Sequence, residues 1–175
     1  HNRNYISIAT TRPETMLGEG AISVHPDDKR YKNIIGKEVI IPIANRAIPI
    51  IADEYPDPNF GSGAVKITGA HDFNDYSVAK KHKLDFFKLM DESACLLNED
   101  FIPKKYRGLE RFKAREILLE DLDKASFLLK TEQKKIIQPF GDRSKVVVEP
   151  SLTKQWFVDT KKIVQPAIDA VKDGR

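Results

Sequence analysis

Apolar residues recur along the chain with two periods, and each period predicts a different kind of element. A helical period appears at residues 109–129 and 160–172, where one face of the segment collects the apolar residues. A shorter charged helix is expected at residues 27–35, closed by Gly36, and another after His71. Short apolar or alternating runs predict strands at residues 5–10, 38–43, 47–51, 64–68, 134–137 and 146–149.

These strands and helices follow one another at irregular spacing, which is typical of an α+β domain rather than of a doubly wound sheet. We expect a compact, mixed, β-barrel-like sheet with peripheral helices. Residues 38–43 and 47–51 are separated by a short polar turn and therefore predict a hairpin, whose Pro42 and Pro49 favour edge or bulge positions.

The charged residues of the 109–129 segment lie off its apolar stripe. Lys113, Arg115 and Lys124 are interpreted as its solvated face.

The stretch Gly61–Tyr76 is the most informative part of the chain. It is interpreted as a glycine turn, a short strand, a second turn and the start of a helix. Alternation along the strand places Val65 and Ile67 on one face, towards a core, because successive side chains point to opposite sides. Lys66 and Thr68 then share the other face with Ala64.

The helix that follows has acidic residues at its start. Asp72 is a good N-cap, and Asp75 falls in the first turn, where the helix dipole favours a carboxylate. A cation at Lys66 and an anion at Asp75 are thus expected near one strand-to-helix corner. From the pattern alone, Asp72 is also explained as a cap, Asp75 as a dipole-compensating acid and Lys66 as an edge-strand lysine that discourages pairing.

A second polar corner, rich in threonine, follows the strand expected at residues 5–10. Thr10, Thr11, Arg12 and Thr15 surround Pro13, and Pro13 suits the first position of a helix. Binding groups are often mounted where a strand ends. The alternative is a turn whose hydroxyls satisfy local backbone groups.

Composition narrows the class of protein. The 175 residues are 41% hydrophobic and 31% charged, as in ordinary globular domains. Basic residues number 29 and acidic residues 26, so the net charge of +3 permits a nucleic-acid partner without requiring one. The single Cys95 excludes an internal disulfide and, with four histidines, a cysteine-rich zinc site, and it predicts a reducing, cytoplasmic setting.

The ends of the chain and its apolar runs add two expectations. No apolar run approaches the length of a membrane span, and the first residues lack the pattern of a signal peptide. The chain also lacks an initiator methionine and moves directly into an expected strand, so we expect a piece of a longer protein.

The sequence lacks the motifs of several classes of enzyme. There is no Gly-x-Ser-x-Gly elbow, and Cys95 has no neighbouring histidine. His71 and His82 are not spaced to share one helical face, so no metal site is expected. The turn before Lys66 only weakly resembles a phosphate-binding loop, which requires Gly-Lys-Ser/Thr. Any catalysis would therefore depend on positioning and electrostatics.

Three motifs in order resemble the editing insertion of class I aminoacyl-tRNA synthetases: Thr10–Gly18 (TTRPETMLG), Gly61–Thr68 (GSGAVKIT) and His71–Tyr76 (HDFNDY). The resemblance is closest to the valyl branch, although leucyl and isoleucyl members share the threonine-rich corner. Later motifs at residues 140–143 (FGDR), 148–150 (VEP) and 155–158 (QWFV) resemble the return to the synthetic core. The resemblance implies an editing domain core at residues 1–150 and a return segment at residues 151–175, packed on the same domain.

The resemblance also implies roles for particular residues. Lys66, with Thr68 beside it, would read a threonyl hydroxyl, and Asp75 would pair with the α-ammonium of the substrate. Catalytic roles are implied for Thr11, Arg12, Lys66 and Asp75, and substrate-binding roles for Thr10, Thr15, Phe60, Thr68 and Asp72. Glu19 departs from the usual aspartate of the family, and Ser62 and Gly69 replace a common threonine and proline.

The implied activity is hydrolysis of threonyl-tRNA(Val) with valyl-tRNA(Val) spared, because a hydrophobic pocket cannot strongly reject an isostere that merely adds a hydroxyl. The acceptor end of tRNA(Val) and a threonyl ester would be the partners of a cytoplasmic monomer without a cofactor. The motifs for amino-acid activation, which uses ATP, are missing from these residues. Three alternatives stay open: a non-catalytic module that binds the tRNA 3′ end, the editing domain of a leucyl or isoleucyl relative, and a nucleotide-phosphate binder built on Gly61–Gly63.

Overall fold

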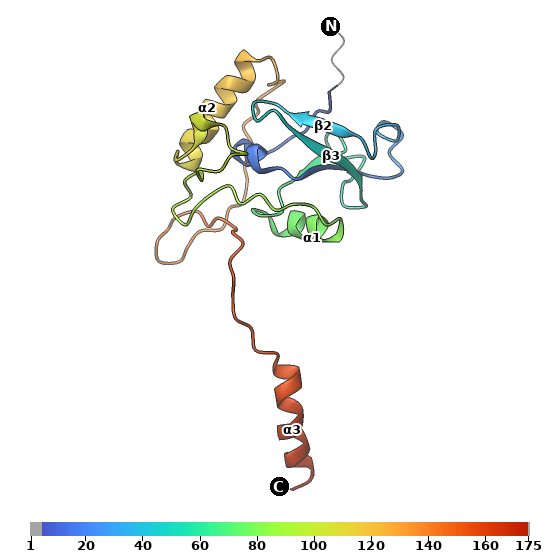
Figure 1. Ribbon diagram of the computed structural model, residues 1–175, viewed down its shortest axis with the longest axis vertical. Helices are drawn as coiled ribbons and strands as arrows, with labels where there is room; N and C mark the ends of the chain where they lie inside the picture. Colours follow the sequence, from blue (N-terminus) through green and yellow to red (C-terminus); the bar gives the residue numbers. More distant parts are fainter. Residues whose placement is uncertain (1–4, 175) are drawn as a thin grey trace.

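The computed structural model describes residues 5–174, and its elements follow in the order η1, β1, β2, β3, β4, α1, η2, α2, α3 (Figure 1). The strands are β1 (Ala21–Val24), β2 (Glu38–Ile41), β3 (Arg46–Ala52) and β4 (Ala64–Ile67). The α-helices are α1 (Phe73–Lys81), α2 (Arg111–Lys124) and α3 (Thr160–Lys172), and the 3₁₀ helices are η1 (Pro13–Gly18) and η2 (Lys104–Tyr106).

The four strands form one mixed sheet in the order β2-β3-β1-β4. β2 and β3 make the antiparallel hairpin that the sequence predicts, whereas β1 is parallel to β3 and antiparallel to β4. This confirms an α+β fold with a mixed sheet. The sheet is open, so the barrel-like closure is not confirmed. Four strands, three of which have only four residues, are too few and too short to wrap round a closed core.

Pro49 lies in β3, an inner strand, contrary to the expected edge position. The reason is in the register: β2 pairs with Arg46–Pro49, whereas β1 pairs only with residues from Ile50 onward. The missing N–H of Pro49 therefore falls outside the ladder between β1 and β3.

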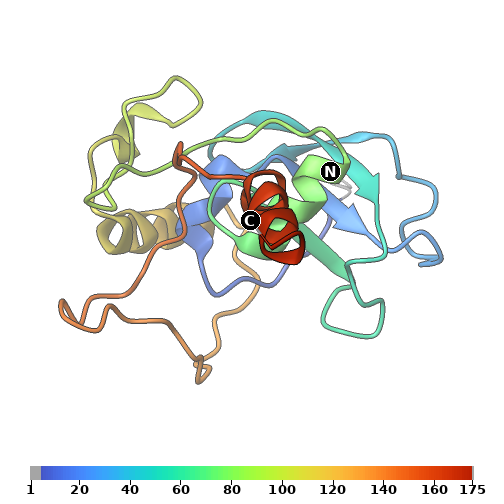
Figure 2. The same cartoon turned by 90° about the horizontal axis from the view of Figure 1, so that it is seen from below.

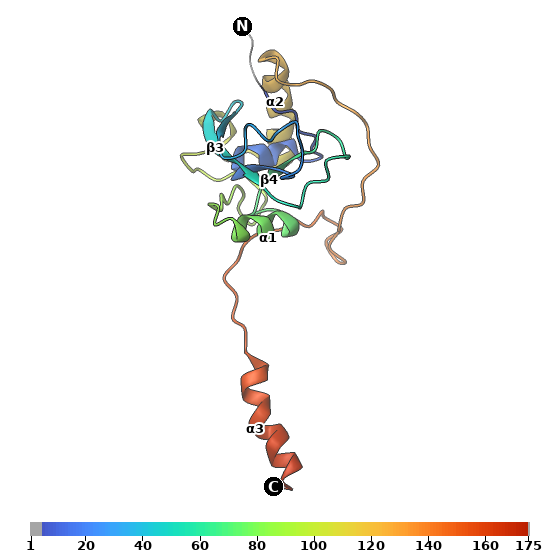
Figure 3. The ribbon, with the colours of Figure 1, turned by 90° about the vertical axis from the view of Figure 1, so that its right-hand side faces the viewer.

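The sheet separates two hydrophobic clusters. The smaller cluster contains Ala21, Ile67, Val78 and Ala79 and lies under α1, which covers one face of the sheet (Figures 1 and 3). The larger cluster lies on the other side, between the sheet, η1 and α2, and Ala64 packs there. The sequence correctly places Ile67 towards a core, but it misses that the Ala64 face of β4 is covered too.

η1 lies between α2 and the sheet, as Figure 2 shows from below. Its residues Thr15 to Gly18 are all buried, and Met16 and Leu17 belong to the larger cluster. η1 is therefore held from two sides, by the sheet and by α2, which fixes the threonine-rich corner that leads into it.

Several expected elements do not form. Residues 5–10, 134–137 and 146–149 are not strands, and near the last two only the isolated bridge between Phe140 and Val147 is present in the described chain. These short apolar runs have no neighbouring strand to complete a ladder. Residues 27–35 form turns instead of a helix. α2 begins after Glu110, whose carboxylate caps it, and ends at Lys124, so it is shorter than the predicted 109–129 helix.

α3 matches the predicted amphipathic helix, but none of its residues is buried. Figures 1 and 3 show it beyond an extended segment, apart from the sheet. The division into a core at 1–150 and a return segment at 151–175, packed on the same domain, stays a prediction, and residues 1–4 and 175 of these ranges lie outside the described residues. Over the part that is described, no helix has the length and apolarity to cross a membrane.

Candidate functional site

The threonine-rich corner is built by the start of η1. Arg12 is the residue before the helix, and Pro13 occupies its first turn, as the sequence predicts. The backbone N–H and the hydroxyl of Thr15 both donate to the Arg12 carbonyl, at 3.1 and 2.9 Å. At the other end of η1, the Gly20 N–H donates to the Ile67 carbonyl at 2.8 Å, which ties η1 to the end of β4.

Lys66 joins this corner to β4. Its ammonium donates to the hydroxyl oxygens of Thr15 and Thr68, both at 2.8 Å, and the side chain is half-buried. We call Thr15, Lys66 and Thr68 the lysine–threonine cluster. An ammonium has three N–H groups, so within the described residues one of them is left for another acceptor. Together with Asp75, the cluster brings three predicted site residues of the strand-to-helix corner next to Thr15 of the threonine-rich corner.

Asp75 is attached to the cluster through the backbone. Its Oδ2 accepts the Thr68 N–H at 2.8 Å, and only 5% of the residue is exposed. Burial raises the pKa of this carboxyl above its ordinary value, while the Thr68 N–H and the charge of Lys66 act in the opposite direction. The first-turn position therefore does not bring the pKa of Asp75 below its ordinary value. A cation in the site, such as a substrate ammonium, would stabilise the charged form.

Asp72 has the geometry of a helix cap. Its Oδ1 accepts the N–H groups of Asn74 and Asp75, at 2.8 and 3.1 Å, and the side chain is exposed. The cap interpretation is confirmed, whereas a substrate-binding role for Asp72 stays a prediction. Tyr55, which the sequence did not single out, lies near Asp75 and helps to lower the pKa of that carboxyl. Burial and the two nearby carboxyls raise the pKa of Tyr55 to about 12, so its hydroxyl keeps its proton.

Arg12 makes a hydrogen bond and ion pairs within the protein. Its Nη1 donates to the His71 carbonyl at 2.9 Å, and its Nη2 pairs with Glu149. Glu149 also pairs with Arg111 of α2, so one carboxylate is held by two guanidinium groups. The third nitrogen of Arg12, Nε, lies 3.6 Å from Glu14. Arg12 therefore joins the two corners to the chain at residue 149, and its expected contact with a terminal adenosine stays a prediction.

His71 binds Pro150, the residue that follows Glu149. Its Nε2 accepts the Leu89 N–H at 2.8 Å, so in the neutral ring Nδ1 carries the proton and donates to the Pro150 carbonyl at 3.1 Å. Burial lowers the pKa of His71 to about 4, which keeps the ring neutral at pH 7. Glu149 and Pro150 thus contact Arg12, Arg111 and His71. No short stretch of sequence could reveal these contacts, because the residues are far apart in the chain.

Three further predicted site residues lie at the surface, as Asp72 does. Thr10 and Thr11 are exposed, and the Thr10 hydroxyl accepts the Arg12 N–H at 3.0 Å. Phe60 is 72% exposed, and the ammonium of Lys134 lies 5.7 Å from its ring centre. None of the three hydrogen-bonds to Lys66 or Asp75 in the described structure. Phe60 is accessible to a flat partner such as a base.

Glu19 is a buried acid beside the cluster. It is 2% exposed, and burial raises its pKa to about 8. Lys66, Arg46 and Asp75 all act on it electrostatically. The sequence marks Glu19 only as a departure from the family pattern, since nothing local reveals that it is buried.

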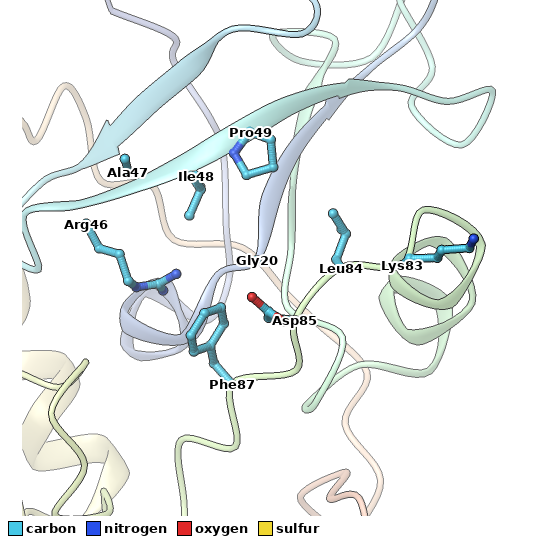
Figure 4. A pocket seen from close by; sticks show the side chains of 9 residues that line it. All are labelled: Gly20, Arg46, Ala47, Ile48, Pro49, Lys83, Leu84, Asp85 and Phe87. Carbon is cyan, nitrogen blue, oxygen red and sulfur yellow. The ribbon is translucent and has the colours of Figure 1, made fainter.

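A hollow of about 250 Å³ opens next to Gly20, between β3 and the segment that follows α1 (Figure 4). It is lined by Gly20, Arg46, Ala47, Ile48, Pro49, Lys83, Leu84, Asp85 and Phe87. The guanidinium of Arg46 lies over the Phe87 ring, 4.0 Å from its centre. In the described range 5–174, no three His, Cys, Asp or Glu side chains are grouped so that they could hold a metal ion.

Comparison with known proteins gives two concordant findings. Residues 27–100 match the family described as leucyl-tRNA synthetase, editing domain. Over 98–99% of its length the chain is also similar to valine–tRNA ligases: 49% identical to that of Legionella pneumophila (strain Paris), 51% to that of Caulobacter vibrioides and 46% to that of Ruegeria pomeroyi. The chain spans about a fifth of the length of these relatives. The family match covers only part of the chain, whereas the similarity to valine–tRNA ligases covers nearly all of it.

Proposed function

We infer that this chain, which belongs to the editing domains of class I aminoacyl-tRNA synthetases and is homologous to those of valine–tRNA ligases, is a hydrolase that acts on mischarged tRNA. The proposed substrate is the threonyl ester at the acceptor end of tRNA(Val), and valyl-tRNA(Val) is spared. The observation that carries the proposal is the lysine–threonine cluster, in which a half-buried ammonium is held by two hydroxyl groups and has one N–H to offer.

The third N–H of the Lys66 ammonium accounts for the discrimination between threonine and valine. A threonyl hydroxyl in the site accepts a hydrogen bond from Lys66, whereas the corresponding methyl group of valine leaves the donor without a partner. An unsatisfied buried polar group costs about 1–3 kcal/mol. In rate, this corresponds to about a 5- to 150-fold preference for the threonyl ester.

Asp75 is proposed to bind the α-ammonium of the substrate. Its carboxyl lies at the N-terminus of α1, held by the Thr68 N–H, so it sits next to the residues that read the side chain. The approaching ammonium stabilises the carboxylate, whose pKa burial has raised. Both ends of the amino acid are then recognised across one corner of the fold.

The reaction is a hydrolysis. Water forms a bond to the ester carbonyl carbon, the bond from this carbon to the ribose oxygen breaks, and the ribose oxygen takes a proton. Thr11 and Arg12 are proposed to hold the terminal adenosine and the attacking water, and Phe60 to stack on a base. Thr10 and Thr15 are proposed to line the substrate pocket. The proposal needs no cofactor, and the monomeric state and the cytoplasmic location stay predictions.

Deacylation of threonyl-tRNA(Val) and valyl-tRNA(Val) by the full-length protein tests the proposal. Lys66→Met keeps most of the length of the side chain but removes its donors, so we expect it to lose the preference for the threonyl ester. Asp75→Asn should lower the rate for the threonyl ester. Lys113→Met, an exposed lysine on α2, is the matched control and should behave as wild type.

Equal cleavage of both esters by the wild-type protein would contradict the role of Lys66. Binding of the tRNA without cleavage of either ester would instead favour the non-catalytic binding module.

A further inference from the structure

Glu19 is buried, and one of its carboxyl oxygens has no hydrogen-bond partner in the described structure. Only 2% of the residue is exposed, and Oε1 is buried without a hydrogen bond in the described structure. Gly18 and Gly20, on either side, press against the segment after α1. A Cβ on Gly18 would lie 3.2 Å from the Phe87 carbonyl oxygen, and one on Gly20 would lie 3.0 Å from that of Asp85. The backbone around Glu19 therefore has little room to move.

Three elements place charged groups around Glu19. Lys66 comes from β4, Arg46 from β3 and Asp75 from α1. The packed segment after α1 adds Asp85 and Lys88, both of which are exposed. Glu19 thus lies within electrostatic range of both groups that are proposed to read the substrate, the ammonium and the carboxyl.

The guanidinium of Arg46 contacts Leu17 and Phe87 rather than Glu19. Its Nη2 donates to the Leu17 carbonyl at 3.1 Å, and Figure 4 shows the guanidinium turned across the hollow towards Phe87. Its Nε is buried without a partner in the described structure. Arg46 lowers the energy of a charge on Glu19, but no hydrogen bond joins the two residues in the described part of the chain.

We propose that Glu19 is a positioning residue for Lys66, and that it acts as a neutral carboxylic acid. A neutral Glu19 leaves the ammonium on the hydroxyl groups of Thr15 and Thr68, with its third N–H free for the substrate. An ionised Glu19 would add a buried negative charge near Lys66 and would draw the ammonium away from them, because an ammonium is attracted more strongly by an opposite charge than by the dipole of a hydroxyl group.

The protonation of Glu19 agrees with this role. Burial raises its pKa to about 8, against the lowering effects of Lys66 and Arg46 and together with the raising effect of Asp75. A carboxyl with a raised pKa is neutral below that pH and charged above it. Selectivity for the threonyl ester should therefore be near its maximum at neutral pH and should fall as the pH rises through about 8.

The test uses the full-length protein and Glu19→Gln, which copies the shape of the neutral acid and cannot ionise. Glu116→Gln, at an exposed glutamate of α2, is the matched control. Three quantities are compared at about pH 7 and about pH 9. They are the infrared band of protonated carboxyl groups, the position of the Lys66 ammonium in crystals, and the ratio of threonyl to valyl ester cleavage after subtraction of spontaneous hydrolysis.

At neutral pH, we expect a protonated-carboxyl band that Glu19→Gln lacks. At the higher pH, the wild-type ammonium should leave Thr15 and Thr68, and the cleavage ratio should fall about tenfold. Glu19→Gln should keep both the position of the ammonium and the ratio. The control should follow the wild type in all three quantities.

The absence of that band at neutral pH would overturn the inference, as would a Lys66 ammonium that stays in place in the wild type at the higher pH. The inference rests on the proposed function only for the cleavage ratio. If the wild type cleaves no threonyl ester, the proposed function fails, and the band and the Lys66 position still decide the role of Glu19.

Discussion

Replacement of Arg115 by methionine should destabilise the domain strongly, although the sequence pattern places Arg115 on a solvated face. The structure corrects that interpretation: the Nε and Nη2 atoms of Arg115 donate to the two carboxylate oxygens of Glu14, at 2.7 and 2.8 Å. Glu14 lies on η1 and is 0% exposed. The pair therefore fastens α2 to the helix that carries Thr15.

The expected loss in the free energy of unfolding depends on how Glu14 is paired after the substitution. Methionine fills much of the space of the arginine stem, but among residues 5–174 Glu14 then keeps only Arg12 as a charged partner, with its Nε 3.6 Å away. Removing one partner of a buried ion pair costs about 3–5 kcal/mol. Because the Arg115 side chain is 25% exposed and water can reach the vacated position, we expect the lower end, about 3 kcal/mol.

Urea unfolding of the 175-residue chain, followed by far-ultraviolet circular dichroism, measures this change. Lys113→Met on the same helix is the control, since it removes only an exposed pair with Glu116. A double variant with Glu14→Leu and Arg115→Met should recover most of the loss, because no buried charge is left unpaired. The reasoning is refuted if Arg115→Met changes the free energy of unfolding no more than Lys113→Met does.

Three further substitutions test other parts of the structure. Asp72→Ala removes the cap of α1 and should cost about 1 kcal/mol in urea unfolding, whereas Asp72→Ser should cost less. Gly63→Ala should also destabilise, because φ is +74° and the Arg30 side chain would have to move away from the added Cβ; a neutral effect would contradict that geometry. Burial alone would raise the pKa of Asp53, but hydrogen bonds from Lys81 and His82 lower it to about 2. Since the unfolded state takes up the proton first, the wild type should lose stability as the pH falls from about 4 to about 2, and Asp53→Asn should show a shallower loss in acid unfolding.

The sequence by itself determined the parts of this protein whose signals are local. Asp72 marks the start of α1, Pro13 marks the start of η1, and two apolar runs around a short turn mark the hairpin of β2 and β3. Caps, proline positions and short turns act within a few residues, so a short stretch of sequence is enough to read them. The proximity of Lys66 and Asp75 was predictable for the same reason, since they are nine positions apart across one strand-to-helix corner.

Only the tertiary structure decided which charged groups are buried and what they contact. Glu14 and Arg115 are 101 positions apart, and Arg12 and Glu149 are 137 apart, so neither pair leaves a pattern in any short stretch. The burial of Glu19 and the openness of the sheet depend in the same way on how distant segments pack. Residues 134–137 (KKII) end in two β-branched isoleucines, which favour a strand, but the described structure places no strand beside them. A β-strand is stabilised by hydrogen bonds to a neighbour that its own sequence does not contain.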